Sequence, residues 1–305
     1  MKKRKQHYVW RNYLRAWAVN DKLFCLRKGK IFFSDLMGLA NERDFYRLNE
    51  LSLAEIEFIK KLAIDGSPEI LKRIHQNFIN GFTQVYTLRN SLRQNNLSND
   101  EIDEKIDELI NNLEEDYHSK IEGSAVKYIE ALIRKETHFF ETEDGRIDFL
   151  YYLCNQYMRT KKMKNNVIQA TNYQDKINVE NIWNALKHIY ATNISFSLNR
   201  QPEFKLILLN NLTQLPFITG DQPVINTFAI DKDLTAQVDE LELYYPISPT
   251  TGILIRKKYK VDSSYINDIN DEQEIELYNS YIIKESHEQI YSNSEETLKN
   301  ILDKS

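Results

Sequence analysis

Glycine and proline, the residues that most often interrupt helices and strands, are scarce in this sequence. Only eight of the 305 residues are glycine and six are proline, well below the average usage of about 7% and 5%. So few interruptions favour long regular elements and disfavour a many-stranded sandwich with frequent tight turns. The glycines are also scattered, so the chain lacks the Gly-rich phosphate-binding loop of the common nucleotide-binding folds.

Apolar spacing and capping motifs predict a helical region over residues 52–196. Ser52-Leu-Ala-Glu55 is a capping box, and Pro68 stands at the first position of a helix that Gly81 would end. A second capping box at Ser98 opens an acidic helix over 98–117 with a narrow apolar stripe. We expect this helix to project from the body and to pair with the next one, at about 119–135. Further helices are expected at about 145–160, after Asn178, and at about 271–289 and 294–303.

Short apolar runs predict strands at both ends of the chain. Residues 22–27 and 30–33 flank Lys28-Gly29, a hairpin pattern. After Arg200 several β-type runs follow, separated by turn residues. Because an isolated hairpin is marginal in water, we expect it to pair with these later strands. The sequence thus predicts an α+β fold with a mostly antiparallel sheet, as a single domain over 1–305 with an inserted helical lobe at 52–196.

Charge is unevenly distributed along this chain of net charge −5. Residues 1–30 carry ten Lys or Arg and one acid, whereas residues 98–116 carry nine acids and one base, and residues 262–305 are acidic as well. We expect residues 1–5 to form a mobile basic arm. Such an asymmetry is typical of proteins that bind nucleic acid through one face. The alternative is that the basic arm pairs with the acidic tail inside the fold.

The length of the apolar runs and the number of cysteines indicate where in the cell the protein is located. No apolar run approaches the roughly 20 residues that span a bilayer, and the basic N-terminus is not followed by the apolar stretch of a signal peptide. Cys25 and Cys154 lie far apart and match no zinc-site spacing. We therefore expect a cytoplasmic protein with free, buried thiols and no membrane partner.

Three motifs resemble those of a bacterial family. They are Gln6-His-Tyr-Val-Trp-Arg-Asn-Tyr-Leu-Arg15, Phe217-Ile-Thr-Gly-Asp-Gln-Pro-Val224 and Tyr245-Pro-Ile-Ser-Pro249. Together they resemble domain-of-unknown-function family 4238, which has His-Tyr-Val-Pro and Thr-Ser-Asp-x-Pro motifs; Trp10 and Gly220 depart from the family pattern. Weaker similarities in the same order are Glu42 to Tyr46, Gln156 to Arg159, and Asn279. The resemblance implies no reaction, and a role in phage defence or toxicity is the expectation it carries.

Two residues of these motifs are the first candidates for chemistry. His7, expected at a helix start, could act as a general base or a metal ligand near neutral pH. Its alternative is a structural histidine that fixes the N-terminal turn. Asp221 follows an apolar strand, at a sheet edge where catalytic carboxylates commonly lie. Its alternative is a turn in which the carboxylate bonds the nearby backbone.

Further acids and cations complete a set that suits phosphodiester hydrolysis. Asp44, Glu122 and Asp221 would hold Mg²⁺ or Mn²⁺, while Arg11 and Arg159 would stabilise phosphate charge. We expect His7, Arg11, Glu122, Arg159 and Asp221 to line one cleft between the sheet and the helical lobe. The alternative is a buried Arg–carboxylate network with a structural role.

The sequence therefore predicts a metal-dependent nuclease or related phosphoesterase, acting as a bacterial defence effector or toxin. The N-terminal aromatic and arginine residues could stack on bases and hold phosphates. The alternative is a non-catalytic module that binds nucleic acid or a partner protein. A nucleotide-sensing domain is a third possibility, although the chain lacks the usual glycine motifs.

Overall fold

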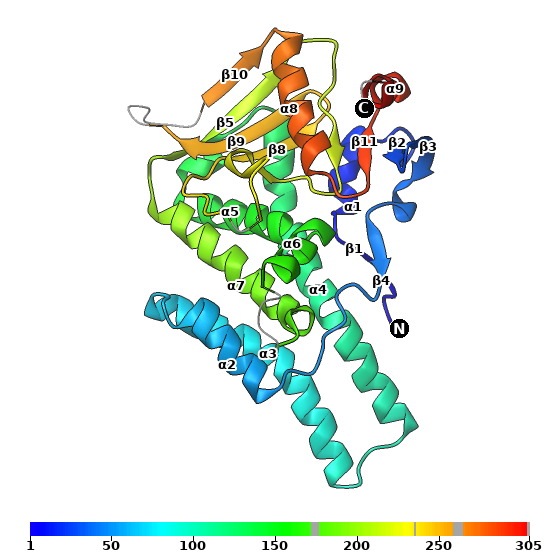
Figure 1. Cartoon of the computed structure of the whole chain (residues 1–305), viewed down its shortest axis with the longest axis vertical. Coiled ribbons are helices and arrows are strands. Elements are labelled where there is room, and N and C mark those ends of the chain that lie inside the picture. Colours follow the sequence, from blue (N-terminus) through cyan, green and yellow to red (C-terminus); the bar gives the residue numbers. More distant parts are fainter. Residues whose placement is uncertain (172–176, 235, 259–264, 304–305) are drawn as a thin grey trace.

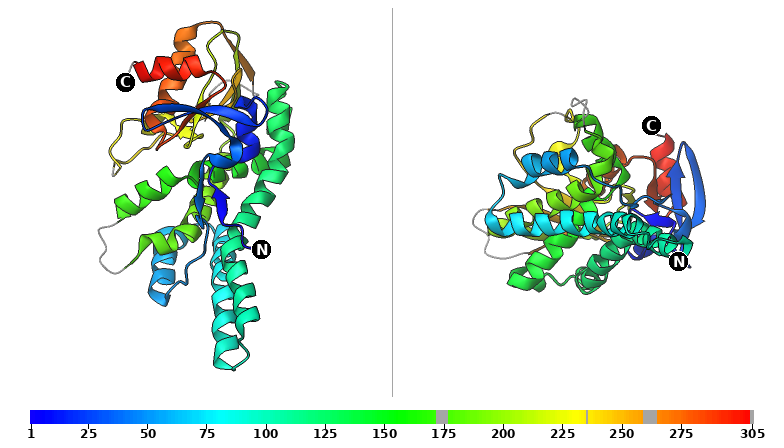
Figure 2. Two further views of the ribbon diagram at one scale, coloured as in Figure 1. Left: turned by 90° about the vertical axis from the view of Figure 1, so that its right-hand side faces the viewer. Right: turned by 90° about the horizontal axis from the view of Figure 1, so that it is seen from below.

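The computed structural model describes residues 1–171, 177–234, 236–258 and 265–303. Most of the strands and the C-terminus lie at one end of the molecule, helices form the middle with the N-terminus beside them, and a two-helix arm projects from the other end (Figures 1 and 2). The fold is α+β, as the sequence predicts, and all but one of the strand pairs are antiparallel among the described residues.

A five-stranded sheet forms the centre of the strand region. Its order is β10 (Tyr265–Ile269), β5 (Phe204–Asn211), β9 (Thr251–Lys257), β8 (Leu243–Ser248) and β7 (Ile225–Asn226), with β10 and β5 parallel. Leu206 and Leu208 of β5 belong to the apolar core that includes α5 (Glu143–Met158) and α7 (Val179–Arg200). The alternate residues Ile207 and Leu209 pack in the core of α8 (Glu272–Glu285). Burial on both faces explains why β5 is continuously apolar.

The predicted hairpin is confirmed and joins strands from late in the sequence. β2 (Lys22–Arg27) and β3 (Lys30–Asp35) are connected by Lys28 and Gly29, whose φ angles of 51° and 69° suit a tight hairpin turn. β2 pairs with β11 (Ile290–Ser292), and β11 pairs with β6 (Thr219–Gly220). The hairpin thus lies in a separate four-stranded sheet, next to α9 (Glu295–Asp303), and not in the five-stranded one.

The N-terminal motif folds as a strand followed by a short helix, so the expectation that His7 stands at a helix start is wrong. β1 (Lys5–His7) pairs with β4 (Asn41–Arg43), and Tyr8 N–H donates to the carbonyl of Ala40. Only then does α1 (Arg11–Leu14) begin. His7 therefore lies at a strand end, because pairing with β4 satisfies the backbone that a helix would have used.

Two of the helices are longer than the sequence predicts. α2 (Leu53–Ile59) begins with the capping box that the sequence predicts at Ser52, but α3 (Glu69–Gln94) runs through Gly81 without interruption. The two helices expected at 98–117 and 119–135 are one helix, α4 (Asp100–Ile133). Neither Gly nor Pro lies at that junction, and Ser119 Oγ donates to the Glu115 carbonyl within the helix. α6 (Lys161–Thr171) completes the helical region.

The projecting arm consists of the later part of α3 and the first half of α4, while the start of α3 lies against α7 (Figure 1). The acidic helix does project, but its partner is the preceding helix and not the following one. Ile106 and Ile110 of α4 pack with Ile79 and Phe82 of α3. Farther along, α4 enters the body, where Glu114 is fully buried.

Both cysteines are buried free thiols, as expected. Among the described residues, no helix combines the length and apolar character that crossing a membrane requires.

Candidate functional site

A cavity of about 640 Å³ lies between the N-terminal segment and the buried half of α4. The N-terminal segment supplies the cations Lys3, Arg4, Lys5, Arg11 and Arg15 together with His7 and Trp10. From α4 come Glu115, His118, Ser119, Glu122 and Gly123. These five residues are spaced by three and four positions, so they share one face of the helix. Gly123 adds room, since a Cβ there would have no atom within 4 Å.

The N-terminal residues are held on α4 by complementary charge and by backbone bonds. Met1 and Lys2 pair with Glu108 and Asp107, and Gln6 Nε2 donates to the Asn111 carbonyl at 2.8 Å. The segment expected to be a mobile arm therefore contacts the acidic part of α4. Among the described residues, the cations of residues 1–3 pair with acids of α4 and not with the acidic C-terminal residues.

Two cations of the cavity stay available for a ligand. Lys3, Arg4 and Arg15 pair with nearby aspartates. In the described part of the chain, Lys5 and Arg11 take part in no ion pair, and Arg11 contacts only the Met37 sulfur at its guanidinium. An anionic ligand would find these two charges without breaking an existing pair.

Arg159 lines the cavity but is engaged in holding the N-terminal strand. Its Nε donates to the Tyr8 carbonyl at 3.1 Å, one Nη to the His7 carbonyl at 2.8 Å, and the other Nη to Glu122 at 2.6 Å. Arg159 is 2% exposed and Glu122 9% exposed. The pair is the buried Arg–carboxylate network that the sequence left open as an alternative, and Arg159 fixes the backbone of His7 and Tyr8.

His7 is a neutral imidazole with an unused nitrogen. Burial and three nearby cations lower the pKa of His7 to about 4, opposed by a hydrogen bond to the Met37 backbone. Its Nε2 is buried and has no hydrogen-bond partner among the described residues. A neutral imidazole with a free nitrogen can accept a proton or bind a metal ion.

Asp221 lies outside the cavity lining and organises a loop. Its carboxylate accepts backbone N–H groups from His287 at 2.7 Å, Glu288 at 2.8 Å and Gln289 at 3.1 Å. The neighbouring Gly220 is needed for space: an added Cβ would come within 2.0 Å of Ser286 Oγ. The motif around Asp221 therefore joins β6 to the segment between α8 and β11.

Asp44 also lies outside the cavity lining. It pairs with Arg4 at 2.9 Å and Arg43 at 3.6 Å, next to β4. Of the predicted site residues, the structure therefore brings His7, Arg11, Glu122 and Arg159 around one cavity, whereas Asp44 and Asp221 contribute elsewhere.

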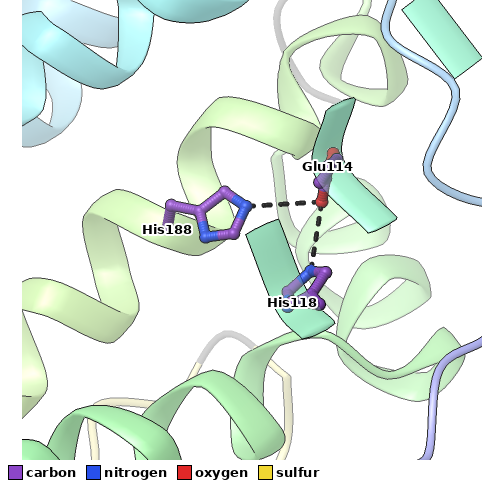
Figure 3. A group of neighbouring side chains, drawn as sticks. All are labelled: Glu114, His118 and His188. Atoms are coloured by element: carbon purple, nitrogen blue, oxygen red, sulfur yellow. Dashed lines mark hydrogen bonds and ion pairs between the residues drawn. The ribbon is translucent and has the colours of Figure 1, made fainter. Parts of the chain in front are cut away.

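A second group of polar residues lies behind the cavity and was not predicted. Glu114 and His118 of α4 and His188 of α7 form it, all three buried (Figure 3). The Nε2 atoms of His118 and His188 lie 3.3 and 3.4 Å from the same oxygen of Glu114. No other set of three or more His, Cys, Asp or Glu in the described residues has its ligand atoms so close together.

Lys187 neutralises the charge of Glu114, because its Nζ pairs with the same Oε1. Burial lowers the pKa of Lys187 to about 8, with Glu114 opposing the shift. Burial alone would raise the pKa of Glu114, but Lys187 and the imidazoles bring it below its ordinary value. Burial likewise lowers the pKa of both histidines, so they are neutral near pH 7.

The cluster fits a metal ion. Glu114 Oε2 is buried and has no hydrogen-bond partner in the described residues, which is costly unless something else satisfies it. Two neutral imidazoles and one carboxylate are ligands that Zn²⁺, Fe²⁺ and Mn²⁺ accept, whereas Mg²⁺ prefers oxygen alone. The group could therefore hold a metal, with a transition metal favoured over Mg²⁺.

His118 connects the two features, since it belongs to the cluster and lines the cavity. Next to it, burial raises the pKa of Glu115 to about 7; Arg159 opposes the shift and Glu122 adds to it. The sequence did carry a signal for the cluster. Glu114 and His118 are four residues apart beside the apolar stripe of one helix, and Lys187 and His188 stand between the apolar residues Leu186 and Ile189 of another.

Comparison with known proteins identifies a family but no relative of known activity. No curated protein and no solved structure is similar enough to this chain to count as a match. The family model described as "Protein of unknown function (DUF4238)" matches residues 5–296 of the 305. The motif resemblance is thereby confirmed over nearly the whole length: the chain belongs to the DUF4238 family.

Proposed function

We propose that this chain is a metal-dependent phosphoesterase whose substrate binds in the basic cavity. The observation that carries the proposal is the position of His118, which is both a member of the buried Glu-His-His cluster and part of the cavity wall. A metal ligand at a cavity wall gives a bound substrate access to the ion, as catalysis requires.

Each group around the cavity then has a chemical role. Glu114, His118 and His188 would hold the ion, which would polarise the phosphoryl oxygen and lower the pKa of a bound water. Lys5 and Arg11 would bind the phosphate, because they have no competing carboxylate in the described residues. The free nitrogen of His7 would accept a hydrogen bond from the attacking water and so orient it, since the lowered pKa of His7 keeps the imidazole neutral at pH 7.

A nucleic-acid phosphodiester, as expected from the sequence, is one form of such a substrate. A defence or toxin role would follow from cleavage of nucleic acid in the cell, and rests on the family resemblance alone. Mn²⁺ agrees with the ligand chemistry of the cluster better than Mg²⁺ does.

A non-catalytic binding module is the second candidate. The observation that favours it is the ion pair between Lys187 and Glu114, which balances the buried charge without any metal. In that case the cavity would bind an anion and leave it unchanged.

Hydrolysis of bis(4-nitrophenyl) phosphate, single-stranded DNA and RNA tests the proposal, with Zn²⁺, Mn²⁺, Fe²⁺ or Mg²⁺ added to EDTA-treated protein. We expect turnover with a transition metal, and a loss of at least about 100-fold in His188→Gln and Arg11→Ala. His287→Gln and Arg73→Ala are matched controls, since neither residue lines the cavity or belongs to the cluster. Absence of turnover with every metal and substrate, while the protein still binds phosphate esters, would favour the non-catalytic module.

A further inference from the structure

We infer that the ligand of the cavity is a nucleoside phosphate, with its base stacked on Trp10. This inference takes its site from the proposed function but does not depend on the metal or on turnover. It rests on the placement of charge, carboxylates and one aromatic ring around a single cavity.

Opposite charges lie on opposite walls of the cavity. The N-terminal wall is cationic, and its Lys5 and Arg11 are free to bind. The α4 wall presents Glu115 and Ser119. A simple inorganic anion would use only the cationic wall. A ligand with a phosphate at one end and hydroxyl or amine donors at the other would use both, and carboxylates are common acceptors for ribose hydroxyls.

Trp10 adds an apolar surface to the N-terminal wall. It is half-buried, lines the cavity, and makes an edge contact with Tyr152 at a centroid distance of 5.9 Å. That contact restrains the ring, so a base that stacks on it loses little freedom of the indole. Stacking of a base on an aromatic ring strengthens binding by roughly ten-fold or more, enough to distinguish a nucleotide from a sugar phosphate.

Size and charge favour a single nucleotide over a polynucleotide. A cavity of about 640 Å³ is within the range of small-molecule sites, roughly 300–1,000 Å³. The α4 wall offers no cation to the continuous phosphate backbone of a longer strand, since its lining residues are Glu115, His118, Ser119, Glu122 and Gly123. The N-terminal residues that a strand would need are also paired, since Lys3, Arg4 and Arg15 each contact an aspartate.

Tryptophan fluorescence provides a direct test. The chain has three tryptophans. Trp17 and Trp183 are at most 1% exposed, so Trp10 is the one tryptophan on which a bound base can stack. We would titrate the EDTA-treated, metal-free protein with AMP, CMP, GMP, UMP, ribose 5-phosphate and a ten-residue oligonucleotide. Calorimetry would give the affinity of ligands that do not quench.

Variants separate stacking from charge. Trp10 has φ −61° and ψ 121°, which proline can adopt, so Trp10→Pro should fold and lose the stacking surface. We expect it to weaken nucleotide binding about ten-fold. Trp10→Phe should retain more affinity but lose the fluorescence change. Arg11→Ala should weaken binding about ten-fold, and Arg73→Ala should leave it unchanged.

The expected result is that mononucleotides quench the fluorescence and bind at least about ten-fold more tightly than ribose 5-phosphate. Equal affinity for ribose 5-phosphate, no effect of Trp10→Pro on affinity, or binding of the oligonucleotide without any mononucleotide would each overturn the inference. Because no metal is present, loss of nucleotide binding overturns this inference alone, while absent turnover in the preceding assay overturns only the phosphoesterase proposal.

Discussion

Replacing Asp221 should lower the free energy of unfolding, because its carboxylate holds the backbone of a loop in place. It is 1% exposed and accepts three backbone N–H groups from residues 287–289. A hydrogen bond to a charged group contributes about 1.5–3 kcal/mol, and a buried donor left without a partner costs about 1–3 kcal/mol. Water can reach two of the three donors, since only the bond from Gln289 N–H is fully buried.

We therefore expect Asp221→Ala to lower the free energy of unfolding by about 3–5 kcal/mol. The full cost of an unpaired buried donor falls on Gln289 N–H, and smaller costs fall on the N–H groups of His287 and Glu288. Asp221→Asn should cost about half as much. Its single carbonyl oxygen can replace Oδ2, which accepts from both Glu288 and Gln289, but its amide then faces the N–H of His287. The stability order is wild type, Asp221→Asn, Asp221→Ala.

Urea unfolding followed by far-ultraviolet circular dichroism measures these differences. Asp231→Asn is the matched control, because Asp231 is exposed and pairs only with Lys284 in the described structure, and should change stability by less than about 0.5 kcal/mol. If Asp221→Ala stayed within about 1 kcal/mol of wild type, the loop-organising role would be refuted and a catalytic one would regain support.

Three further predictions follow from individual contacts. Gly220→Ser should destabilise the protein by about 1–3 kcal/mol in the same unfolding assay, and adding Ser286→Gly should recover part of that loss because it removes the atom 2.0 Å from the new Cβ. The pKa of His7 is about 4 in the folded protein, against an ordinary value of 6.5. The free energy of unfolding of wild type should therefore fall by up to about 3 kcal/mol as the pH falls from 6.5 to 4, because the unfolded chain takes up a proton that the folded protein does not. His7→Gln should lack that part of the decline, and parallel pH profiles of wild type and variant would contradict this prediction. Lys187→Met should bind Zn²⁺ or Mn²⁺ more tightly in calorimetry, because the ammonium competes for the Glu114 oxygen; weaker binding would show that Lys187 supports the site.

The fold was predictable where local pattern and tertiary structure agree. The hairpin around Lys28-Gly29 and the capping box at Ser52 are local signals, and both are present. Helix ends were less predictable. Gly81 lies in an exposed turn of α3 with open space around it, so the cost of about 1 kcal/mol for a helical glycine is outweighed by the packing of the rest of the helix.

The candidate site was predictable only in part. His7, Arg11, Glu122 and Arg159 come together because a buried arginine needs acceptors, and it finds them in Glu122 and in the backbone of residues 7 and 8. Asp221 lies in a family motif, as His7 and Arg11 do in another, but the motif pattern cannot tell a catalytic carboxylate from one that caps a loop. The loop it holds lies 66 residues away in sequence.

The buried Glu-His-His cluster needed the tertiary structure. Glu114 and His118 lie on one helix, but His188 comes from another helix 70 positions later, and no sequence spacing records that α4 and α7 bring them together. The only local sign of the cluster in the sequence was the presence of ionisable residues such as Glu114 and Lys187 among apolar helical positions.

The central claim is that Glu114, His118 and His188 form a metal site at the wall of the cavity, and metal stoichiometry tests it most directly. EDTA-treated wild type, Glu114→Gln, His188→Gln and the control His287→Gln would each be titrated with Zn²⁺ and Mn²⁺ by calorimetry, with bound metal measured by mass spectrometry after desalting. The account predicts one ion per chain in wild type and in His287→Gln, and at least about a ten-fold loss of affinity in the two cluster variants. Wild type that retains no stoichiometric metal, or cluster variants that bind as wild type does, would contradict it.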